Sequence, residues 1–188
     1  MFKDFLRDMR KMRTGNDGTR TLFESVMSPE VGIALSDWVK ATDNNYVLVG
    51  GMALSFHVKP RYTEDIDILY LNKSDVPLKV NGFNKHRNHA FEHKKYGVEV
   101  ELLDPEFINM PKETAKLIYD NAIVSNGYKI ASKEGLIVSK LFRFNRRDQA
   151  DIEDVINNYK GDIDLSKYNL SKDLMDKYNS IADSLNQN

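Results

Sequence analysis

Two alternating carboxylates give the first indication of chemistry in this chain. Asp65 and Asp67 alternate with isoleucines in an otherwise apolar run. In a β-strand this spacing places both carboxylates on one face, roughly 6 to 7 Å apart along the chain, and turns the isoleucines toward the core. Carboxylate oxygens that share a face suit a hard divalent cation. The pattern therefore predicts a metal site, and we expect its ion to be Mg²⁺ or Mn²⁺.

A Gly-Gly pair upstream of these carboxylates predicts an anion site. Gly50 and Gly51 follow the apolar run 47–49 and lead into a helical pattern over residues 52–57. Backbone N–H groups at a helix N-terminus bind anions, and glycine leaves them accessible because it has no Cβ. We interpret the pair as a phosphate cradle, and the alternative is a plain turn or a close-packing site.

A second alternating run, residues 98–103, predicts another strand with acidic residues on one face. Glu99 and Glu101 share that face because they are two residues apart. Either of them can supply a third carboxylate to the site of Asp65 and Asp67. Their spacing alone leaves the choice between them open.

These segments occur in an order that resembles a known superfamily. A strand, Gly-Gly, a short helix and Arg-x-Thr-x-Asp-x-Asp (residues 61–67) resemble the nucleotidyltransferases with the DNA polymerase β palm. More narrowly, they resemble the branch of AbiEii-type toxin nucleotidyltransferases and small lincosamide and aminoglycoside nucleotidyltransferases. Residues 130–141 resemble that branch's A-x-x-E-x-L-I-x-x-K-L helix, and residues 147–152 resemble its K-D-x-x-D-I segment. The matched blocks span residues 46 to 156.

The resemblance implies an α/β fold of the polymerase β-like nucleotidyltransferase type, with a mixed, twisted sheet, flanking helices and helical N- and C-terminal segments. We expect one domain over residues 1–188. Its expected parts are a helical segment over residues 1–40, a core palm with the metal site over 46–104, and a mostly helical part over 112–188.

The implied reaction transfers a nucleoside monophosphate from a nucleoside triphosphate, such as ATP, to an acceptor, and releases pyrophosphate. Relatives use two Mg²⁺ or Mn²⁺ ions, roughly 3.5 to 4 Å apart, which need about three convergent carboxylates. Asp65, Asp67 and Glu101 are the expected catalytic and metal-ligating residues. Glu101 is preferred to Glu99 because the family places an acid-Leu-Leu sequence at that strand's end. Glutamate replaces the commoner aspartate there.

The resemblance also implies five nucleotide-binding residues: Gly50, Gly51, Arg61, Thr63 and Lys140. Many superfamily members have Gly-Ser where this chain has Gly-Gly, so backbone donors must suffice. Arg61 either reaches the triphosphate or braces the loop before the aspartates, and Thr63 can cap that loop through its hydroxyl. Lys140 is a β/γ-phosphate ligand by resemblance, and the alternative is a lysine that extends from a core helix to solvent.

Other polar residues have structural roles as their simplest interpretation. Asp148 and Asp151 lie at the start of a predicted helix, where they favour its dipole or pair with arginines, although the branch uses an acid in this region. The spacing His86-x-x-His89-x-x-x-His93 loosely suggests zinc, but no cysteine accompanies it. We expect these histidines to form a solvated basic loop near the acceptor site.

Composition narrows the class of protein. With 188 residues, of which 41% are hydrophobic and 29% charged, the chain can bury one sizeable core. A net charge of −1 argues against a generally basic nucleic-acid-binding surface and leaves local patches, for example in residues 1–13 and 140–147. The absence of cysteine excludes disulfides, thiolate catalysis and sulfur ligands. No apolar run approaches the roughly 18 residues of a membrane span, so we expect a cytoplasmic protein.

Periodicity and breakers predict the remaining elements. The expected helices cover residues 2–13, a short segment capped by Thr19 or Thr21 and ending at Met27, and 29–39, 112–121, 133–143, 148–158 and 171–184. The expected strands cover residues 47–49, 66–71 and 98–103, together with a hairpin of 122–124 and 128–130 that turns at Asn126-Gly127. Phe83, Phe91 and Tyr96 are interpreted as hairpin or edge-strand aromatics, and Trp38 as a core residue.

The acceptor stays open at this point. The toxin relatives imply an RNA, especially a tRNA end, or a protein hydroxyl, and they imply an antitoxin partner. The antibiotic-modifying relatives imply a small hydroxylated molecule. A rival of another class is a non-catalytic nucleotide-binding module, for which loss of the carboxylate trio would be the sign. The trio is present in this chain.

Overall fold

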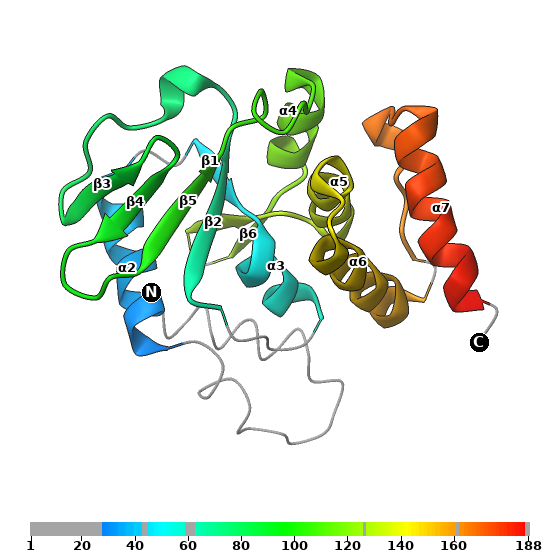
Figure 1. Ribbon diagram of the computed structural model, residues 1–188, viewed down its shortest axis with the longest axis horizontal. Coiled ribbons are helices and arrows are strands. Elements are labelled where there is room, and N and C mark those ends of the chain that lie inside the picture. Colours follow the sequence, from blue (N-terminus) through cyan, green and yellow to red (C-terminus); the bar gives the residue numbers. More distant parts are fainter. Residues whose placement is uncertain (1–27, 43–44, 59–62, 126, 161, 187–188) are drawn as a thin grey trace.

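The computed structural model describes residues 28–42, 45–58, 63–125, 127–160 and 162–186. The expected helix over residues 2–13 and the short helix ending at Met27 lie outside these residues. The described residues form a seven-stranded mixed sheet with helices packed around it, which is consistent with the predicted nucleotidyltransferase-like fold (Figure 1).

The sheet has the strand order β3-β4-β5-β2-β1-β7-β6. Its strands are β1 (Tyr46–Leu48), β2 (Asp65–Tyr70), β3 (Phe83–Arg87), β4 (Ala90–His93), β5 (Glu99–Leu103), β6 (Ile123–Ser125) and β7 (Tyr128–Ile130). The central strand β2 is antiparallel to β1 and parallel to β5. The pairs β3–β4 and β6–β7 are antiparallel, and each of them ends at one edge of the sheet.

The register of β2 and β5 gives the two faces of the sheet different characters. Asp65 lies opposite Glu99, and Asp67 lies opposite Glu101, so all four carboxylates are on one face. The residues between them, such as Ile66 and its partner Val100, are fully buried on the other face. Burial of the apolar face therefore forces the acidic residues to stand side by side.

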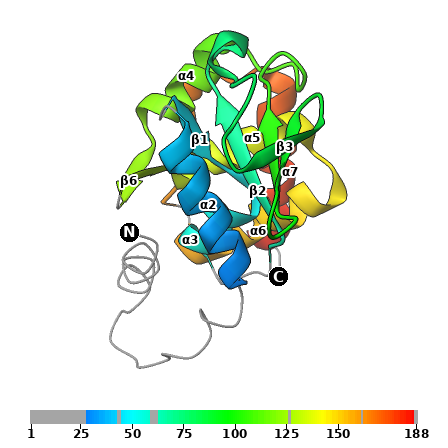
Figure 2. The ribbon, with the colours of Figure 1, turned by 90° about the vertical axis from the view of Figure 1, so that its left-hand side faces the viewer.

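Helix α2 (Pro29–Ala41) packs on the apolar face. The ring of Trp38 lies 5.1 Å from that of Phe83 and 5.4 Å from that of Phe91, both edge to face. The predicted N-terminus is confirmed, because the Ser28 hydroxyl accepts a hydrogen bond from the Val31 N–H and proline occupies the first turn. Figure 2 shows α2 in front of β1 from this side.

The other helices lie to one side of the sheet in Figure 1, with the carboxyl-terminal helix farthest from it. They are α3 (Gly50–His57), α4 (Lys112–Asp120), α5 (Lys133–Arg143), α6 (Arg146–Tyr159) and α7 (Lys172–Asn186), with short 3₁₀ turns η1 (Lys73–Asp75) and η2 (Ser166–Tyr168). Helix α3 contacts β2 and α5, α5 and α6 form a tight pair, and α7 packs on the far side of that pair.

Several boundaries differ from the predicted ones for identifiable reasons. β1 and β2 each begin one residue earlier than expected, since pairing with neighbouring strands already includes Tyr46 and Asp65. Helix α3 begins at Gly50 instead of residue 52, so both glycines belong to its first turn. Helix α6 begins two residues before Asp148, because Asn145 and Asp148 form a capping box.

The carboxyl-terminal half follows the expected pattern closely. Helix α5 has the predicted bounds, and the predicted hairpin is present as β6 and β7, with Gly127 at a φ of +82° in its turn. None of the helices among the described residues is both long enough and apolar enough to cross a membrane.

Candidate active site

A pocket of about 130 Å³ brings together the sheet carboxylates, the Gly-Gly pair and the α5–α6 helix pair. Six of the residues predicted from the sequence line it, namely Gly50, Gly51, Asp65, Asp67, Glu101 and Lys140. The other two predicted residues differ from each other: Thr63 is described and lies outside the pocket lining, behind Asp65, whereas the position of Arg61 is not described.

Asp67 is the most buried carboxylate on the sheet side of the pocket, with 8% of its surface exposed. Burial, together with the nearby carboxylates of Asp65 and Glu101, raises the pKa of Asp67 to about 7. The Arg143 guanidinium and the Gly51 N–H act in the opposite direction. The Gly51 N–H donates a hydrogen bond to Asp67 Oδ2 at 3.4 Å. The sheet side of the pocket thus concentrates negative charge that lacks a full counter-charge.

The two glutamates that the sequence could not separate have different surroundings. Glu101 stands beside Asp67 in the sheet and lines the pocket. Glu99 stands beside Asp65 but turns to the β3–β4 hairpin, where Arg87 Nη2 donates to it at 3.0 Å and His86 Nε2 lies 3.6 Å away. Glu101 is therefore the better placed third carboxylate.

The loop before β2 is held by Thr63. Its Oγ1 lies 2.8 Å from Asp65 Oδ1 and 3.1 Å from the Asp65 carbonyl oxygen, and the residue is 2% exposed. This is the loop-capping role considered for Thr63 from the sequence. In this arrangement the hydroxyl positions Asp65 and is not directed into the pocket.

The Gly-Gly pair meets the sheet at a very close distance. Gly50 has a φ of +56°, and a Cβ there would lie 1.6 Å from Asp67 Oδ2. At Gly51 a Cβ would lie 2.9 Å from Thr63 Oγ1. Glycine is needed at both positions, and most strictly at Gly50. The predicted phosphate cradle also differs in one respect, because the Gly51 N–H donates to Asp67 instead of facing an open space.

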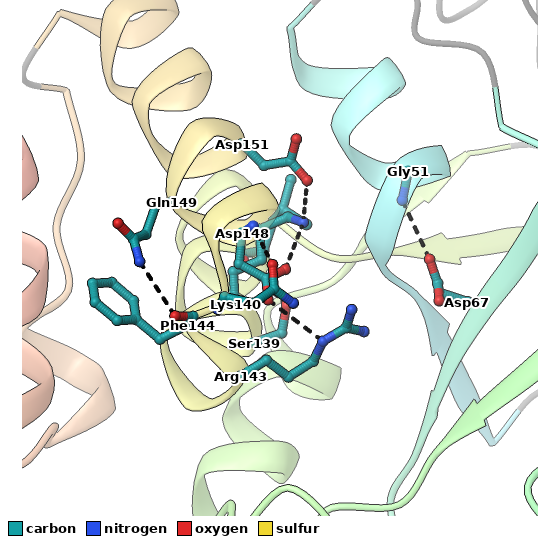
Figure 3. A network of polar contacts seen from close by, with 11 residues as sticks. Gly51, Asp67, Ser139, Lys140, Arg143, Phe144, Asp148, Gln149 and Asp151 are labelled. Atoms are coloured by element: carbon teal, nitrogen blue, oxygen red, sulfur yellow. Dashed lines mark hydrogen bonds and ion pairs between the residues drawn. The ribbon is translucent and has the colours of Figure 1, made fainter.

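The helix side of the pocket contains a buried ion-pair cluster (Figure 3). Lys140 Nζ lies 2.5 Å from Asp151 Oδ2 and 3.4 Å from Asp148 Oδ1. Arg143 Nε lies 3.6 Å from Asp148 Oδ2. Lys140, Asp148 and Asp151 are all buried, so Lys140 does not extend to solvent as the alternative interpretation required. Asp148 also caps α6, as the sequence suggested.

Sequence reasoning missed part of this cluster. Arg143 and Arg147 line the pocket, and the two aspartates of α6 face Lys140 there. The signal was present in the spacing, since Lys140 and Arg143 are three residues apart on one helix and Asp148 and Asp151 are three apart on the next. Such pairs share a helix face, and the short connection between α5 and α6 lets the two faces meet.

The donor set suits a hard cation, but the side chains are not arranged around one. Carboxylate oxygens of Asp65, Asp67 and Glu101 are the ligands that Mg²⁺ prefers. Among the residues that the structure describes, however, no three acidic or histidine side chains lie close enough together to hold one ion. Asp65 is turned to Thr63 and Asp67 to Gly51. Joint ligation therefore requires rotation of side chains that are already adjacent in the sheet.

A larger pocket, of about 500 Å³, lies at the opposite ends of α3 and α5 and does not have this chemistry. Its polar groups are largely paired. His57 contacts the Tyr159 hydroxyl at 3.0 Å and the Ala131 carbonyl at 2.6 Å, and Lys133 contacts Asp162 at 2.6 Å. Burial lowers the pKa of His57. We therefore assign the chemistry to the smaller pocket, where five carboxylates and three cations converge.

The fold, the paired strand carboxylates and the Gly-Gly helix start define a nucleotidyltransferase class of protein. The chain belongs to a family described as nucleotidyltransferases of unknown function (DUF6036), which matches residues 34–188 and so includes every residue of the pocket. The superfamily inferred from the sequence is thus supported, whereas the narrower AbiEii and lincosamide branch is not confirmed. No curated protein matches the chain.

Two solved structures from Helicobacter pylori are similar to this chain. They are JHP933 and a candidate nucleotidyltransferase, each 18% identical and each covering 84% of this chain. The matched parts make up 92% and 95% of those proteins, with TM-scores of 0.35 and 0.36. At these scores the similarity carries no argument about the reaction.

The close approach of Gly50 to Asp67 can be tested by substitution. Gly50→Ala should lower the free energy of unfolding by more than Gly82→Ala. Both glycines have positive φ, but a Cβ at Gly82 meets nothing within 4 Å. We expect a loss of about 1 to 2 kcal/mol at Gly82 from backbone strain alone, and at least about twice that at Gly50. Urea unfolding of both variants measures the difference, and equal losses would show that the contact with Asp67 is unimportant.

The raised pKa of Asp67 makes a prediction about stability and pH. Between about pH 4 and pH 7 the native carboxyl keeps its proton while the unfolded one has lost it, so stability falls as pH rises. Asp67→Asn removes this loss. In the presence of a chelator its advantage over the parent should grow from near zero below pH 4 to on the order of 1 to 4 kcal/mol above pH 7. Urea unfolding across this range measures it, and a difference that does not change with pH would contradict the assignment.

Proposed function

We propose that this protein transfers a nucleoside monophosphate from a nucleoside triphosphate to an acceptor hydroxyl at the pocket between β2, β5, α3 and α5. The observation that carries the proposal is the register that sets Glu101 beside Asp67, on the face where Gly50 and Gly51 begin α3. Asp65, Asp67 and Glu101 would hold Mg²⁺ or Mn²⁺, which when bound supplies positive charge next to the phosphate oxygens.

The bond changes of this reaction are simple. The acceptor oxygen forms a bond to the α-phosphorus, the bond from that phosphorus to its bridging oxygen breaks, and pyrophosphate leaves. The proton of the acceptor hydroxyl passes to a carboxylate of the trio. The protein contributes orientation and charge, since phosphoryl chemistry of this kind needs little else from side chains.

The helix side of the pocket is suited to the triphosphate. Arg143 extends from α5 toward Asp67 (Figure 3), and Arg147 lines the same pocket. Lys140 is paired with two aspartates, so its charge is largely offset and we expect the arginines to contribute more to phosphate binding. If Asp67 turns away to ligate a cation, the Gly51 N–H becomes available to a phosphate oxygen. Cation and triphosphate binding would then be coupled.

The alternatives for the acceptor are those of the resembling families, namely an RNA or tRNA end, a protein hydroxyl or a small hydroxylated molecule such as an antibiotic. A toxin role with an antitoxin partner belongs to the first two. A non-catalytic nucleotide-binding module is the remaining alternative, and the intact carboxylate trio argues against it.

Transfer can be tested directly with labelled substrates. Each α-³²P-labelled triphosphate is incubated with Mg²⁺ or Mn²⁺ and with total tRNA, the protein alone, or a panel of lincosamides and aminoglycosides. We expect label transfer with the parent and its loss, by at least about a hundred-fold, in Asp67→Asn and Asp65→Asn, because each removes a charged ligand. Equal transfer by the parent and both variants would remove this mechanism from consideration.

The choice between the two glutamates makes a sharper test. Glu101→Gln should lose Mg²⁺-dependent binding of a non-hydrolysable triphosphate, whereas Glu99→Gln should keep it and change turnover only modestly. The two residues lie on the same face of the same strand, so each variant is the matched control of the other. Isothermal titration calorimetry measures both. Binding lost in Glu99→Gln and kept in Glu101→Gln would show that the third ligand is assigned wrongly.

A further inference from the structure

The segment that contains the β3–β4 hairpin has a charge opposite to that of the rest of the chain. Residues 79–96 contain five lysines and arginines and one acidic residue, whereas the whole chain has a net charge of −1. Lys85, His86 and Arg87 on β3 are exposed, as is His89 in the turn. The strand lies at one edge of the sheet. The sequence predicted a solvated basic loop at His86, His89 and His93; His86 and His89 are exposed, but the prediction is wrong for His93, which is buried on β4.

The register connects this hairpin to the catalytic pocket. Arg87 lies opposite Ala90, Ala90 opposite Glu101, and Glu101 opposite Asp67, so Arg87 stands on the carboxylate face. With neighbouring strands roughly 4.8 Å apart, it is roughly 14 Å from Asp67 along this row. The hairpin turn is fixed to β5 as well, because the His89 carbonyl accepts a hydrogen bond from the Leu102 N–H at 2.7 Å.

An exposed aromatic pair lies at the carboxyl-terminal end of β5, next to the turn of the hairpin. Phe107, in the turn after β5, is 73% exposed, and its ring centroid lies 5.4 Å from that of His89 with a tilt of 32°. A single exposed apolar side chain needs no explanation. Here the exposed ring adjoins a second flat ring, His89, and the hairpin that contains His89 also contains exposed cations, a combination that favours stacked bases and phosphates.

Edge-strand lysines have another common explanation, since they prevent pairing between sheet edges. That explanation accounts for Lys85 but not for Phe107, which lies on a turn and not on the edge strand. It also does not account for the histidines. The acidic residues next to the hairpin are already occupied, because Arg87 pairs with Glu99 and His86 lies 3.8 Å from Glu92. These contacts offset part of the charge of Arg87, and the rest of the positive charge of the segment lies on its exposed lysines, Lys79, Lys85, Lys94 and Lys95.

We propose that the β3–β4 hairpin and Phe107 form a docking surface for single-stranded nucleic acid, whose terminal hydroxyl then reaches the pocket of Asp67 and Glu101. Arg87 contacts phosphates on the carboxylate face, Lys85 contacts them from the opposite face of the edge strand, where it pairs with Phe91, and Phe107 with His89 stacks on a base. The assignment of this strand as the acceptor rests on the proposed transferase function. Binding of the strand to the surface does not depend on it.

Binding of fluorescein-labelled single-stranded RNA and DNA, measured by anisotropy at several salt concentrations, tests the surface. Lys85→Glu/Arg87→Glu should weaken binding about ten-fold or more and flatten the salt dependence, because phosphate contacts are lost. Phe107→Ala should weaken it roughly five- to a hundred-fold with the salt dependence unchanged. Triphosphate affinity should stay as in the parent for both variants.

Two matched controls separate local from general effects. Lys116→Glu/Lys172→Glu reverses the same number of charges on α4 and α7, and Val124→Ala removes a 67% exposed apolar side chain from β6 at the other edge of the sheet. Both should bind strands like the parent. Losses in the controls equal to those in the hairpin variants would overturn the proposal. It would also be overturned if Lys85→Glu/Arg87→Glu binds strands like the parent and only changes self-association.

The outcomes also distinguish this inference from the proposed function. If no strand binds but labelled nucleotide is transferred to a protein or a small molecule, the hairpin proposal is wrong and the transferase stands. If strands bind as expected but the parent transfers no nucleotide to any acceptor, the docking surface stands and the transferase is wrong.

Discussion

The parallel register of β2 and β5 is the constraint on which the rest of the structure depends. It aligns two alternating strands so that Asp67 adjoins Glu101 and Asp65 adjoins Glu99 on one face. Like charges at such positions repel one another and lower stability. Burial of Ile66, Ile68 and Val100 on the opposite face holds the register in place, because a shift of one residue would expose them.

The surrounding elements respond to this concentration of charge in different ways. Arg87 on the β3–β4 hairpin pairs with Glu99, which leaves Glu101 as the carboxylate beside Asp67 that lines the pocket. Burial and the neighbouring carboxylates raise the pKa of Asp67, and a glycine at position 50 allows its carboxylate to approach the start of α3. A cation would relieve the remaining repulsion, so the arrangement that lowers stability is also the one that suits a cation.

The helix pair α5–α6 supplies positive charge on the other side of the pocket, and part of that charge is already paired with aspartates. Lys140 is buried between Asp148 and Asp151, so it fixes the two helices to each other as well as facing the pocket. Breaking one partner of such a buried pair leaves an uncompensated charge, which is strongly destabilising. Arg143 and Arg147 line the same pocket. Among the cations that line it, these two are the exposed ones.

The sequence by itself determined the class of fold, the superfamily and most elements, because strand alternation, helix caps and the order Gly-Gly then Asp-x-Asp are local signals. It also predicted six residues that line one pocket. It did not determine which glutamate joins Asp67, that Lys140 pairs with Asp148 and Asp151, or that Arg143 lines the pocket and Phe107 lies beside His89. These depend on contacts between distant segments, such as the register of β2 with β5 and the packing of α5 on α6. Only the tertiary structure decides such contacts, since no local pattern fixes which of two equivalent faces or residues meets a partner.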